Sequence, residues 1–292
     1  MKAMKPDVTC PAASVTRSPG AASGDQSFDD RAQEFRDRIY GSDKGTIRLE
    51  VLRQDFQEIL AAFPEGQTLS ILDAGGGFAP FSRELALLGH QVIVTVISGE
   101  MLEIGRRDTG ELSFPGSGGI SFIPGALQDL PGMFPGRQFD IVMCHAVLEW
   151  LEDPFSALPV LAGLVREGGF LSLMVYSRPA LLFKSLIVGN YRYLENGMRP
   201  LRRKSKMRMT PPNPLDPRET REALKPLGFP ETVLSGIRVF HDYMARYHLA
   251  EIPAEEILSW ELKMRRNPDF AHLGRYAHIF GRKRNGGEGA PG

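Results

Sequence analysis

The sequence predicts an α/β protein built on a doubly wound, mostly parallel β-sheet, and three observations lead to this fold class. A short apolar stretch, residues 70–74, runs into the glycine turn Gly75–Gly77 and then into a helical pattern that begins at Pro80. Strand-like and helix-like stretches then alternate as far as residue 176, as they do in parallel sheets joined by crossover helices. Polar residues follow several of these strands, at the sheet edge where ligands of such folds bind.

The glycine turn is the best-defined local element. Glycine adopts backbone angles that other residues avoid, and it allows a ligand to approach the main chain closely. Proline suits the first turn of a helix, where its missing N–H would be unpaired anyway, and Gly89 is typical of a helix end. Strand, glycine turn and helix form the opening unit of nucleotide-binding sheets. Such a turn also joins strands to helices for packing alone, so by itself it leaves the function open.

The other elements follow from the spacing of apolar residues. A helical arm is expected over residues 28–66, with Tyr40–Arg48 between two helices. The ligand-binding core, 67–177, should contain strands at 69–74, 91–97, 120–124, 139–144 and 169–176 and helices at 80–88, 99–107 and 154–166. A basic insertion and a helix near 218–227 should occupy 178–230, and the C-terminal part, 231–283, should hold strands near 232–240 and 275–283 around helical residues 241–267. A late strand pair fits an antiparallel edge on a parallel sheet.

Composition limits the function classes. Residues 1–27 and 284–292 lack periodicity and are expected to be disordered tails around one domain, 28–283. Lys+Arg and Asp+Glu both total 35, so only local clusters such as Arg199–Arg208 could indicate a nucleic acid partner. The two cysteines, Cys10 and Cys144, provide neither a disulfide framework nor a zinc site and fit a reducing cytosol. We expect a cytoplasmic protein without metal, signal peptide or membrane span.

Several strings make the chain similar to the bacterial tRNA 5-carboxymethoxyuridine methyltransferases, which are class I S-adenosylmethionine-dependent enzymes. The most particular strings are His145–Trp150 and Arg238–Tyr243, and Leu72–Gly77, Gly89–Ile93 and Leu273–Tyr276 also contribute. The resemblance extends from about Phe28 to Lys283. It implies a seven-stranded Rossmann-like methyltransferase sheet with a helical N-terminal arm and a basic insertion.

The resemblance also implies an activity and a set of cofactor contacts. The implied reaction is methyl transfer from S-adenosylmethionine to the carboxylate of 5-carboxymethoxyuridine at the wobble position of tRNA, which forms 5-methoxycarbonylmethoxyuridine. The implied macromolecular partner is the tRNA anticodon loop, and no protein partner can be inferred. The cofactor contacts of the family carry over to Arg48, Gly75, Gly76, Leu127, Gln128 and His145.

Methyl transfer to a carboxylate sets modest chemical requirements. A carboxylate with a pKa near ~4 is ionised at neutral pH, so no general base is needed and no catalytic residue is assigned. The carboxylate must still be oriented, for which arginine is suited, and unpaired bases favour aromatic stacking. The substrate-binding candidates are Arg199, Arg202, Arg203, Arg238, Tyr243, Arg275 and Tyr276, with Tyr191 as a further aromatic residue. For the basic run, a solvated loop without specific contacts is the alternative.

Four positions in the predicted site carry two interpretations or depart from the family pattern. Ala79 replaces the third glycine of the superfamily turn, which is a small change. Val96 stands where the family has an aspartate that binds the ribose hydroxyls, and losing these bonds would weaken cofactor binding by about 1–3 kcal/mol. His145 is either a cofactor contact or a locally bonded strand-end histidine. Asp73 either faces the cofactor region or caps the glycine turn by bonding backbone N–H groups, and we favour the role in the turn.

Three alternatives to the tRNA carboxyl methyltransferase stay open at this point. A nicotinamide-dependent oxidoreductase has the same opening unit, but it would need a glycine where Pro80 stands and an acidic residue after the second strand. A class I methyltransferase could instead act on another RNA or on a small carboxylic acid. A tRNA-binding relative with a degenerate cofactor site is the third alternative, and Val96 is the residue that favours it.

Overall fold

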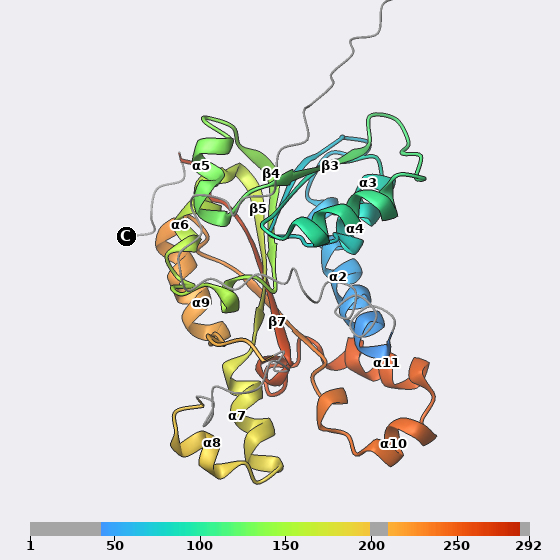
Figure 1. The fold of residues 1–292 in the computed structure, drawn as a ribbon, viewed down its shortest axis with the longest axis vertical. Helices are drawn as coiled ribbons and strands as arrows, with labels where there is room; N and C mark the ends of the chain where they lie inside the picture. Colours follow the sequence, from blue (N-terminus) through green and yellow to red (C-terminus); the bar gives the residue numbers. More distant parts are fainter. Residues whose placement is uncertain (1–41, 199–209, 287–292) are drawn as a thin grey trace, which may run out of the picture.

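A single seven-stranded sheet forms the centre of the molecule. The computed structural model describes residues 42–198 and 210–286, in which the strands follow the order β3-β2-β1-β4-β5-β7-β6 (Figure 1). The predicted doubly wound α/β fold with seven strands is therefore confirmed. The strands are β1 (Ser70–Ala74), β2 (Gln91–Val96), β3 (Gly119–Pro124), β4 (Phe139–His145), β5 (Val165–Tyr176), β6 (Val233–Ile237) and β7 (Tyr276–Arg282).

The sheet is parallel except for one strand. β1 pairs in parallel with β2 on one side and with β4 on the other, so the chain reverses its direction of travel across the sheet beside β1. β7 runs antiparallel to both β5 and β6, between which it lies. The predicted late strand pair thus supplies the antiparallel part of the sheet. Ligands of such sheets bind beyond the carboxyl ends of the strands, next to the point of reversal.

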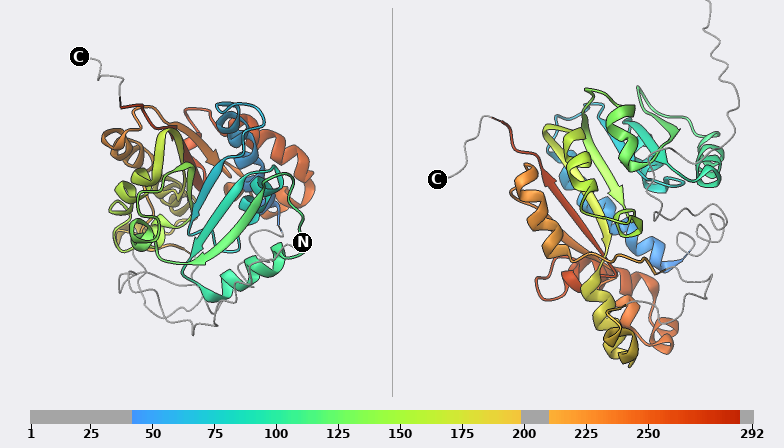
Figure 2. Two further views of the ribbon diagram at one scale, coloured as in Figure 1. Left: turned by 90° about the horizontal axis from the view of Figure 1, so that it is seen from above. Right: turned by 60° about the vertical axis from the view of Figure 1, so that its left-hand side comes forward.

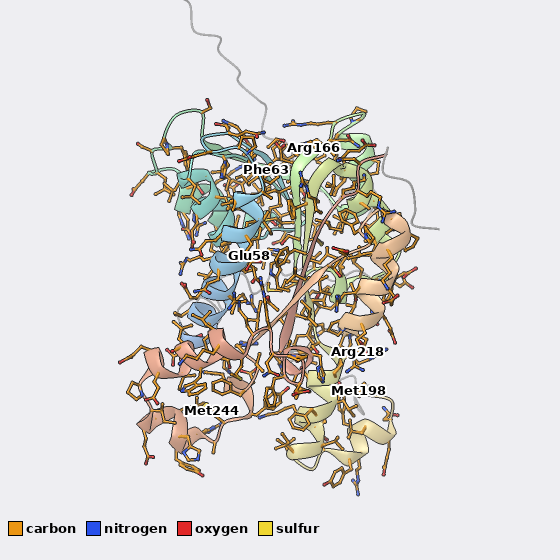
Figure 3. All side chains as sticks on the ribbon, turned by 180° about the vertical axis from the view of Figure 1, so that it is seen from behind. Glu58, Phe63, Arg166, Met198, Arg218 and Met244 are labelled. Atoms are coloured by element: carbon orange, nitrogen blue, oxygen red, sulfur yellow. The ribbon has the colours of Figure 1, made fainter. Side chains whose placement is uncertain are left out.

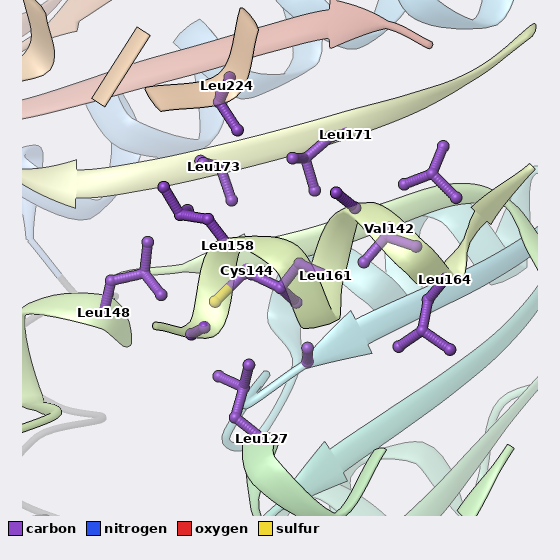
Figure 4. Packing of buried hydrophobic residues seen from close by; sticks show 14 of the residues in the cluster. Leu127, Val142, Cys144, Leu148, Leu158, Leu161, Leu164, Leu171, Leu173 and Leu224 are labelled. Carbon is purple, nitrogen blue, oxygen red and sulfur yellow. The ribbon is translucent and has the colours of Figure 1, made fainter. Parts of the chain in front are cut away.

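Helices cover both faces of the sheet (Figures 1 and 2). On one face, the apolar sides of the helices pack around Phe56, Phe81 and Met101; on the other face, they pack around Leu158 and Phe229. Figure 4 shows part of the second layer, in which leucines of α6 lie against β4 and β5. The first face carries α2 (Asp43–Ala61), α3 (Pro80–Leu87) and α4 (Gly99–Thr109), and the second carries α5 (Leu130–Met133), α6 (Ala157–Leu164) and α9 (Pro217–Leu224).

The amino ends of the central strands are tied together at the edge opposite the ligand-binding side. The backbone N–H and the hydroxyl of Ser70 both donate to Asp140 Oδ2 at 2.7 Å, and Arg166 Nε donates to Asp140 Oδ1 at 2.7 Å. The Arg166 guanidinium also lies 5.6 Å from the centre of the Phe63 ring (Figure 3). These contacts join β1, β4 and β5 to the end of α2, and they fix the register in which the carboxyl ends meet.

Several predicted boundaries are wrong. α2 begins at Asp43, so most of the segment expected to lie between two helices, Tyr40–Arg48, is helical. β5 begins at Val165 instead of 169, because the chain leaves α6 after Leu164 and the pairing with β4 shifts register between Phe139 and Ile141. The helical residues expected before 42 lie outside the described part of the chain.

The C-terminal half also contains elements that the periodicity did not predict. α7 (Arg178–Ile187) and α8 (Tyr191–Glu195) occupy the start of the expected basic insertion and extend beyond the carboxyl end of β5 (Figure 1). β6 ends at Ile237, three residues early, because Arg238 takes a left-handed backbone conformation with φ 59°. The expected helical stretch 241–267 is divided into a 3-10 turn at His241–Tyr243, α10 (Arg246–Glu251) and α11 (Ala254–Met264).

Candidate active site

A cavity opens at the carboxyl ends of β1, β2 and β4, beside the point where the strand order reverses. The cavity and the open space at its mouth together amount to about 980 Å³. All six residues predicted to contact the cofactor line it. Its walls are formed by Arg48, Gly75, Gly76, Gly77, Phe78, Pro80, Val96, Ile97, Ser98, Met101, Gly125, Ala126, Leu127, Gln128, His145, Ala146, Val147, Trp150 and Leu151.

The glycine turn packs against the buried carboxylate of Asp73. The N–H groups of Gly75 and Gly76 both donate to the carbonyl of Thr95 on β2, at 2.8 and 3.2 Å. A Cβ on Gly76 would overlap Asp73 Oδ2, so only glycine fits over this carboxylate. Asp73 accepts a hydrogen bond from the Ser82 hydroxyl at 2.5 Å and thereby joins β1 to α3. Asp73 therefore supports the turn, but through a side chain of α3 and not through the backbone N–H groups that we expected.

Burial changes the acidity of Asp73. The carboxyl group is enclosed, and this burial raises its pKa to about 6, although the hydrogen bond from Ser82 acts in the opposite direction. Its second oxygen, Oδ1, is buried without a hydrogen bond in the described part of the chain. The ionised form of Asp73 is therefore destabilised by its surroundings at neutral pH.

Val96 lies where the sequence places the departure from the family pattern. It ends β2, is 4% exposed, and forms an apolar wall of the cavity together with Ile97 and Met101. The neighbouring Ser98 hydroxyl accepts the Met101 N–H at 3.2 Å and so caps α4. Glu100, four residues after Val96, is exposed on the first turn of α4 and is not part of the wall.

Arg48 and His145 provide polar groups in the cavity wall. Arg48, in the first half of α2, is 3% exposed, and its guanidinium carbon lies 4.4 Å from the centre of the Tyr276 ring. His145 ends β4, and its Nε2 lies 2.8 Å from Ser172 Oγ. Burial, with His278 and the positive charge of Arg48 nearby, holds the pKa of His145 well below its ordinary value. At neutral pH His145 is therefore an uncharged imidazole beside a cation.

Three of the seven predicted substrate-binding residues lie together with Asp242 in one cluster next to Arg48, and a fourth borders it. We call Arg238, Arg275, Tyr276 and Asp242 the arginine cluster. Arg238 Nη2 and Arg275 Nε each lie 3.5 Å from Asp242 Oδ2, and the Arg238 guanidinium carbon lies 5.5 Å from the centre of the Tyr276 ring. The fourth predicted residue, Tyr243, borders the cluster, where its hydroxyl donates to the carbonyl of Leu273 at 2.7 Å.

The arginine cluster carries an excess of positive charge. Burial opposes ionisation of Asp242, but the hydrogen bond with His241 and the charges of Arg238 and Arg275 hold its pKa far below the usual range. Burial raises the pKa of Glu149, near Arg48, to about 8, so this carboxyl group is mostly uncharged at neutral pH. Arg238 is 7% exposed, and its Nε lacks a hydrogen bond partner among the described residues. Two guanidinium groups, of Arg238 and Arg275, therefore share one ionised carboxylate, which suits an anionic ligand.

The remaining predictions fall outside this arrangement. Arg199, Arg202 and Arg203 lie in the part of the chain that the structure does not describe. Tyr191 is on α8 with 59% of its surface exposed, and it is not a cavity residue. Trp150, which was not among the predicted site residues, lines the cavity, while Leu148 nearby is fully buried. Among the described residues, no group of three His, Cys, Asp or Glu side chains is placed to hold a metal ion.

Comparison with known proteins agrees with this geometry. A family profile described as a methyltransferase domain matches residues 72–173, which span β1 to β5. The tRNA 5-carboxymethoxyuridine methyltransferase of Escherichia coli K12 is 36% identical over 259 residues, which cover 89% of this chain and 97% of the relative. The chain belongs to the tRNA 5-carboxymethoxyuridine methyltransferase family. S-adenosylmethionine is the methyl donor of this class of methyltransferases.

More distant relatives share the fold of this methyltransferase family. A ubiquinone biosynthesis O-methyltransferase of Xanthomonas campestris is 29% identical over 149 residues, 51% of this chain and 59% of the relative. The crystal structure of magnesium protoporphyrin IX methyltransferase from Synechocystis PCC 6803 with bound SAH has a TM-score of 0.54 at 18% identity, covering 88% of this chain and 96% of the other. A methyltransferase structure from Thermotoga maritima has a TM-score of 0.54 at 17% identity, covering 88% and 98%.

The described helices contain no segment with both the length and the apolar character of a membrane span.

Proposed function

We propose that this protein transfers a methyl group from S-adenosylmethionine to the carboxylate of 5-carboxymethoxyuridine at the wobble position of tRNA, which forms the methyl ester. One observation carries the choice of acceptor: the arginine cluster adjoins the cavity through Arg48, whose guanidinium lies on the Tyr276 ring. An excess of buried guanidinium groups is costly unless an anion binds them. A carboxylate is such an anion, and it is the acceptor that the name of the relative from Escherichia coli implies.

The cavity suits S-adenosylmethionine in the chemistry of its walls. When bound, this cofactor supplies a methyl group on a positively charged sulfur. Val96, Met101 and Leu127 offer apolar surface for the adenine ring, and Arg48 offers a guanidinium for the cofactor carboxylate. Val96 provides no hydrogen-bond acceptor for the ribose, so the other contacts supply the binding free energy of the cofactor.

In the proposed reaction the protein orients the acceptor carboxylate and excludes water, and it transfers no proton. The acceptor carboxylate is already ionised, since its pKa near ~4 lies well below neutral pH. Arg238 and Arg275 would hold this carboxylate through paired N–H donors, which orients one oxygen toward the cavity. The walls exclude water. The main contribution of these residues to the reaction rate is to hold the nucleophile and the methyl group in a near-attack geometry.

The acceptor base must come from a single-stranded region of RNA. Bases of the anticodon loop are unpaired, so they can enter a site and stack on an aromatic ring. Tyr276 is half-buried beside the guanidinium groups of Arg48 and Arg238, and it is the aromatic residue of the arginine cluster. The basic run Arg199–Arg208 follows α8 in the chain and supports phosphate contacts on the basis of its composition.

The proposal is tested by methylating tRNA in vitro. Purified protein is incubated with S-adenosylmethionine and tRNA that carries 5-carboxymethoxyuridine, and the nucleosides are then analysed by mass spectrometry. We expect loss of the free acid and appearance of its methyl ester. Parallel reactions use bulk RNA without this nucleoside and small carboxylic acids. Methylation of those substrates alone would favour a different acceptor, and tRNA binding without any methyl transfer would favour a non-catalytic relative.

A further inference from the structure

A line of four polar side chains, three of them buried, leads from the interior of the sheet to the cavity. Asp55 Oδ2 lies 2.7 Å from His278 Nδ1, and His278 Nε2 lies 2.8 Å from Ser172 Oγ. Ser172 Oγ lies in turn 2.8 Å from His145 Nε2. We call Asp55, His278, Ser172 and His145 the relay. Its first three members are 0% exposed and come from α2, β7 and β5, whereas His145 lines the cavity at the end of β4.

Charged groups surround the Asp55 end of the relay. Asp55 Oδ1 lies 2.6 Å from Arg266 Nη2 and 3.5 Å from Arg265 Nε, and Arg266 also pairs with Glu58, on α2, at 2.7 Å (Figure 3). The negative charges of two carboxylates and the positive charges of two guanidinium groups therefore balance without a charge on His278. Its ring is further enclosed by Phe56 and Phe280, with ring centres 6.2 and 5.2 Å away. With His278 in its neutral form, no charge in this apolar layer is left unbalanced.

A neutral His278 fixes the direction of every hydrogen bond in the relay. Its Nδ1 must donate to ionised Asp55, because a carboxylate only accepts. Its Nε2 is then an acceptor and receives the Ser172 hydroxyl proton. The Ser172 oxygen is left to accept from His145 Nε2, so His145, which is also neutral, carries its proton there and has a bare Nδ1. In the described part of the chain, no residue hydrogen-bonds to that Nδ1.

We infer that the relay sets the tautomer of His145 so that Nδ1 presents a hydrogen-bond acceptor to the cavity, where it receives the ammonium group of the amino-acid end of the cofactor. Arg48 lines the same cavity and is close enough for its charge to act on His145. A guanidinium and a bare imidazole nitrogen together match the carboxylate and the ammonium of an amino acid. Ser172, His278 and Asp55 are thus positioning residues. The inference rests on the proposed function, since it takes this cavity as the S-adenosylmethionine site.

The test compares two buried serines that both bond within the same network. Ser172→Ala breaks the relay, while Ser235→Ala removes another buried hydroxyl that donates to Asp55 Oδ1 at 3.0 Å but lies off the route to His145. Dissociation constants are measured by calorimetry for S-adenosylmethionine and for 5′-methylthioadenosine, which lacks the amino-acid end. We expect Ser172→Ala to weaken S-adenosylmethionine binding about tenfold and 5′-methylthioadenosine binding less than about twofold. Ser235→Ala should change neither constant by more than about twofold.

A second measurement needs no variant of the relay. In ¹⁵N-labelled wild-type protein, which has six histidines, the His145 resonances are assigned by comparison with His145→Gln. We expect an unprotonated Nδ1 and a protonated Nε2. The opposite tautomer, or equal weakening of both ligands by Ser172→Ala, would overturn the inference while leaving the proposed function intact. If wild-type protein binds neither ligand, the proposed function itself fails.

Discussion

The guanidinium carbon of Arg48 lies 4.4 Å from the centre of the Tyr276 ring, and this contact joins the two halves of the candidate site. Arg48 belongs to the cavity wall, while Tyr276 also faces Arg238 in the arginine cluster. A methyltransferase must bring donor and acceptor within van der Waals distance. A shared cation–aromatic contact at the boundary places the two subsites side by side, so variants on either side of it can separate their roles.

Arg238→Ala should impair the use of tRNA without weakening cofactor binding. Removing this guanidinium deletes a charged contact to the proposed acceptor carboxylate, so kcat/KM for tRNA should fall by about tenfold to a hundredfold. The dissociation constant for S-adenosylmethionine should change by less than about twofold. The matched control is Arg218→Ala, on the exposed first turn of α9. Equal kcat/KM values for the two variants would remove Arg238 from the substrate site.

Gly76→Ala should destabilise the fold and abolish cofactor binding, because the new methyl group would overlap the buried carboxylate of Asp73. Overpacking of this kind costs about 1–3 kcal/mol of unfolding free energy, which urea unfolding would measure. Gly163→Ala provides the control, because a Cβ there meets no atom within 4 Å and the residue lies in α6. If both variants unfold at the wild-type urea concentration, the close approach of Gly76 and Asp73 is wrong.

Val96→Asp should strengthen cofactor binding, because it returns a hydrogen-bond acceptor to the cavity wall near the proposed ribose position. Recovery of about 1.4 kcal/mol would lower the dissociation constant about tenfold in a calorimetric titration. Val96→Leu keeps the wall apolar and should not strengthen binding. An unchanged or raised dissociation constant for a well-folded Val96→Asp protein would show that the ribose lies elsewhere.

Asp73 and Asp140 should affect the pH dependence of stability in opposite directions. The folded-state pKa of Asp73, about 6, exceeds its ordinary value of 3.8, so its ionisation lowers the unfolding free energy as pH rises through this window. At neutral pH the loss amounts to about 3 kcal/mol at most, and Asp73→Asn should recover it. Although burial opposes it, the bonds from Ser70 and Arg166 lower the pKa of Asp140. Asp140→Asn should therefore destabilise the protein at neutral pH, and this effect should fade as acid protonates the wild-type carboxylate.

These two variants are compared by urea unfolding at about pH 4 and about pH 7, where linkage predicts opposite changes. A loss of stability at neutral pH in Asp73→Asn would show that the carboxylate is needed in its ionised form. The comparison also separates the two ends of β1, since Asp73 supports the ligand-binding edge and Asp140 ties together the opposite edge.

Local signals in the sequence were sufficient to predict much of the sheet. The strand before Gly75, the apolar run of β4 and the Pro80 helix start are each encoded within a few neighbouring residues. α7 was not predicted, and several of its apolar residues, such as Leu186 and Ile187, are about half exposed. Its start did have a local signal: the Ser177 hydroxyl accepts the Ala180 N–H, and Pro179 follows.

The site was only partly predictable, because its polar contacts join residues far apart in the chain. His278 interrupts the apolar run of β7, as Ser172 does in β5, and nothing in their spacing indicates that they meet. Asp55 is on an otherwise ordinary helix and reaches His278 across 223 residues. The arginine cluster depends in the same way on the backbone of Arg238, whose left-handed φ of 59° turns the chain out of β6.

The most direct test of the cofactor site is a calorimetric titration of the purified, folded protein with S-adenosylmethionine, repeated on Arg48→Ala. We predict one saturable binding event per chain in the wild type and at least about tenfold weaker binding in the folded variant, since a guanidinium–carboxylate contact is lost. Absence of saturable binding to folded wild-type protein, with tRNA supplied, would contradict the assignment of the cavity.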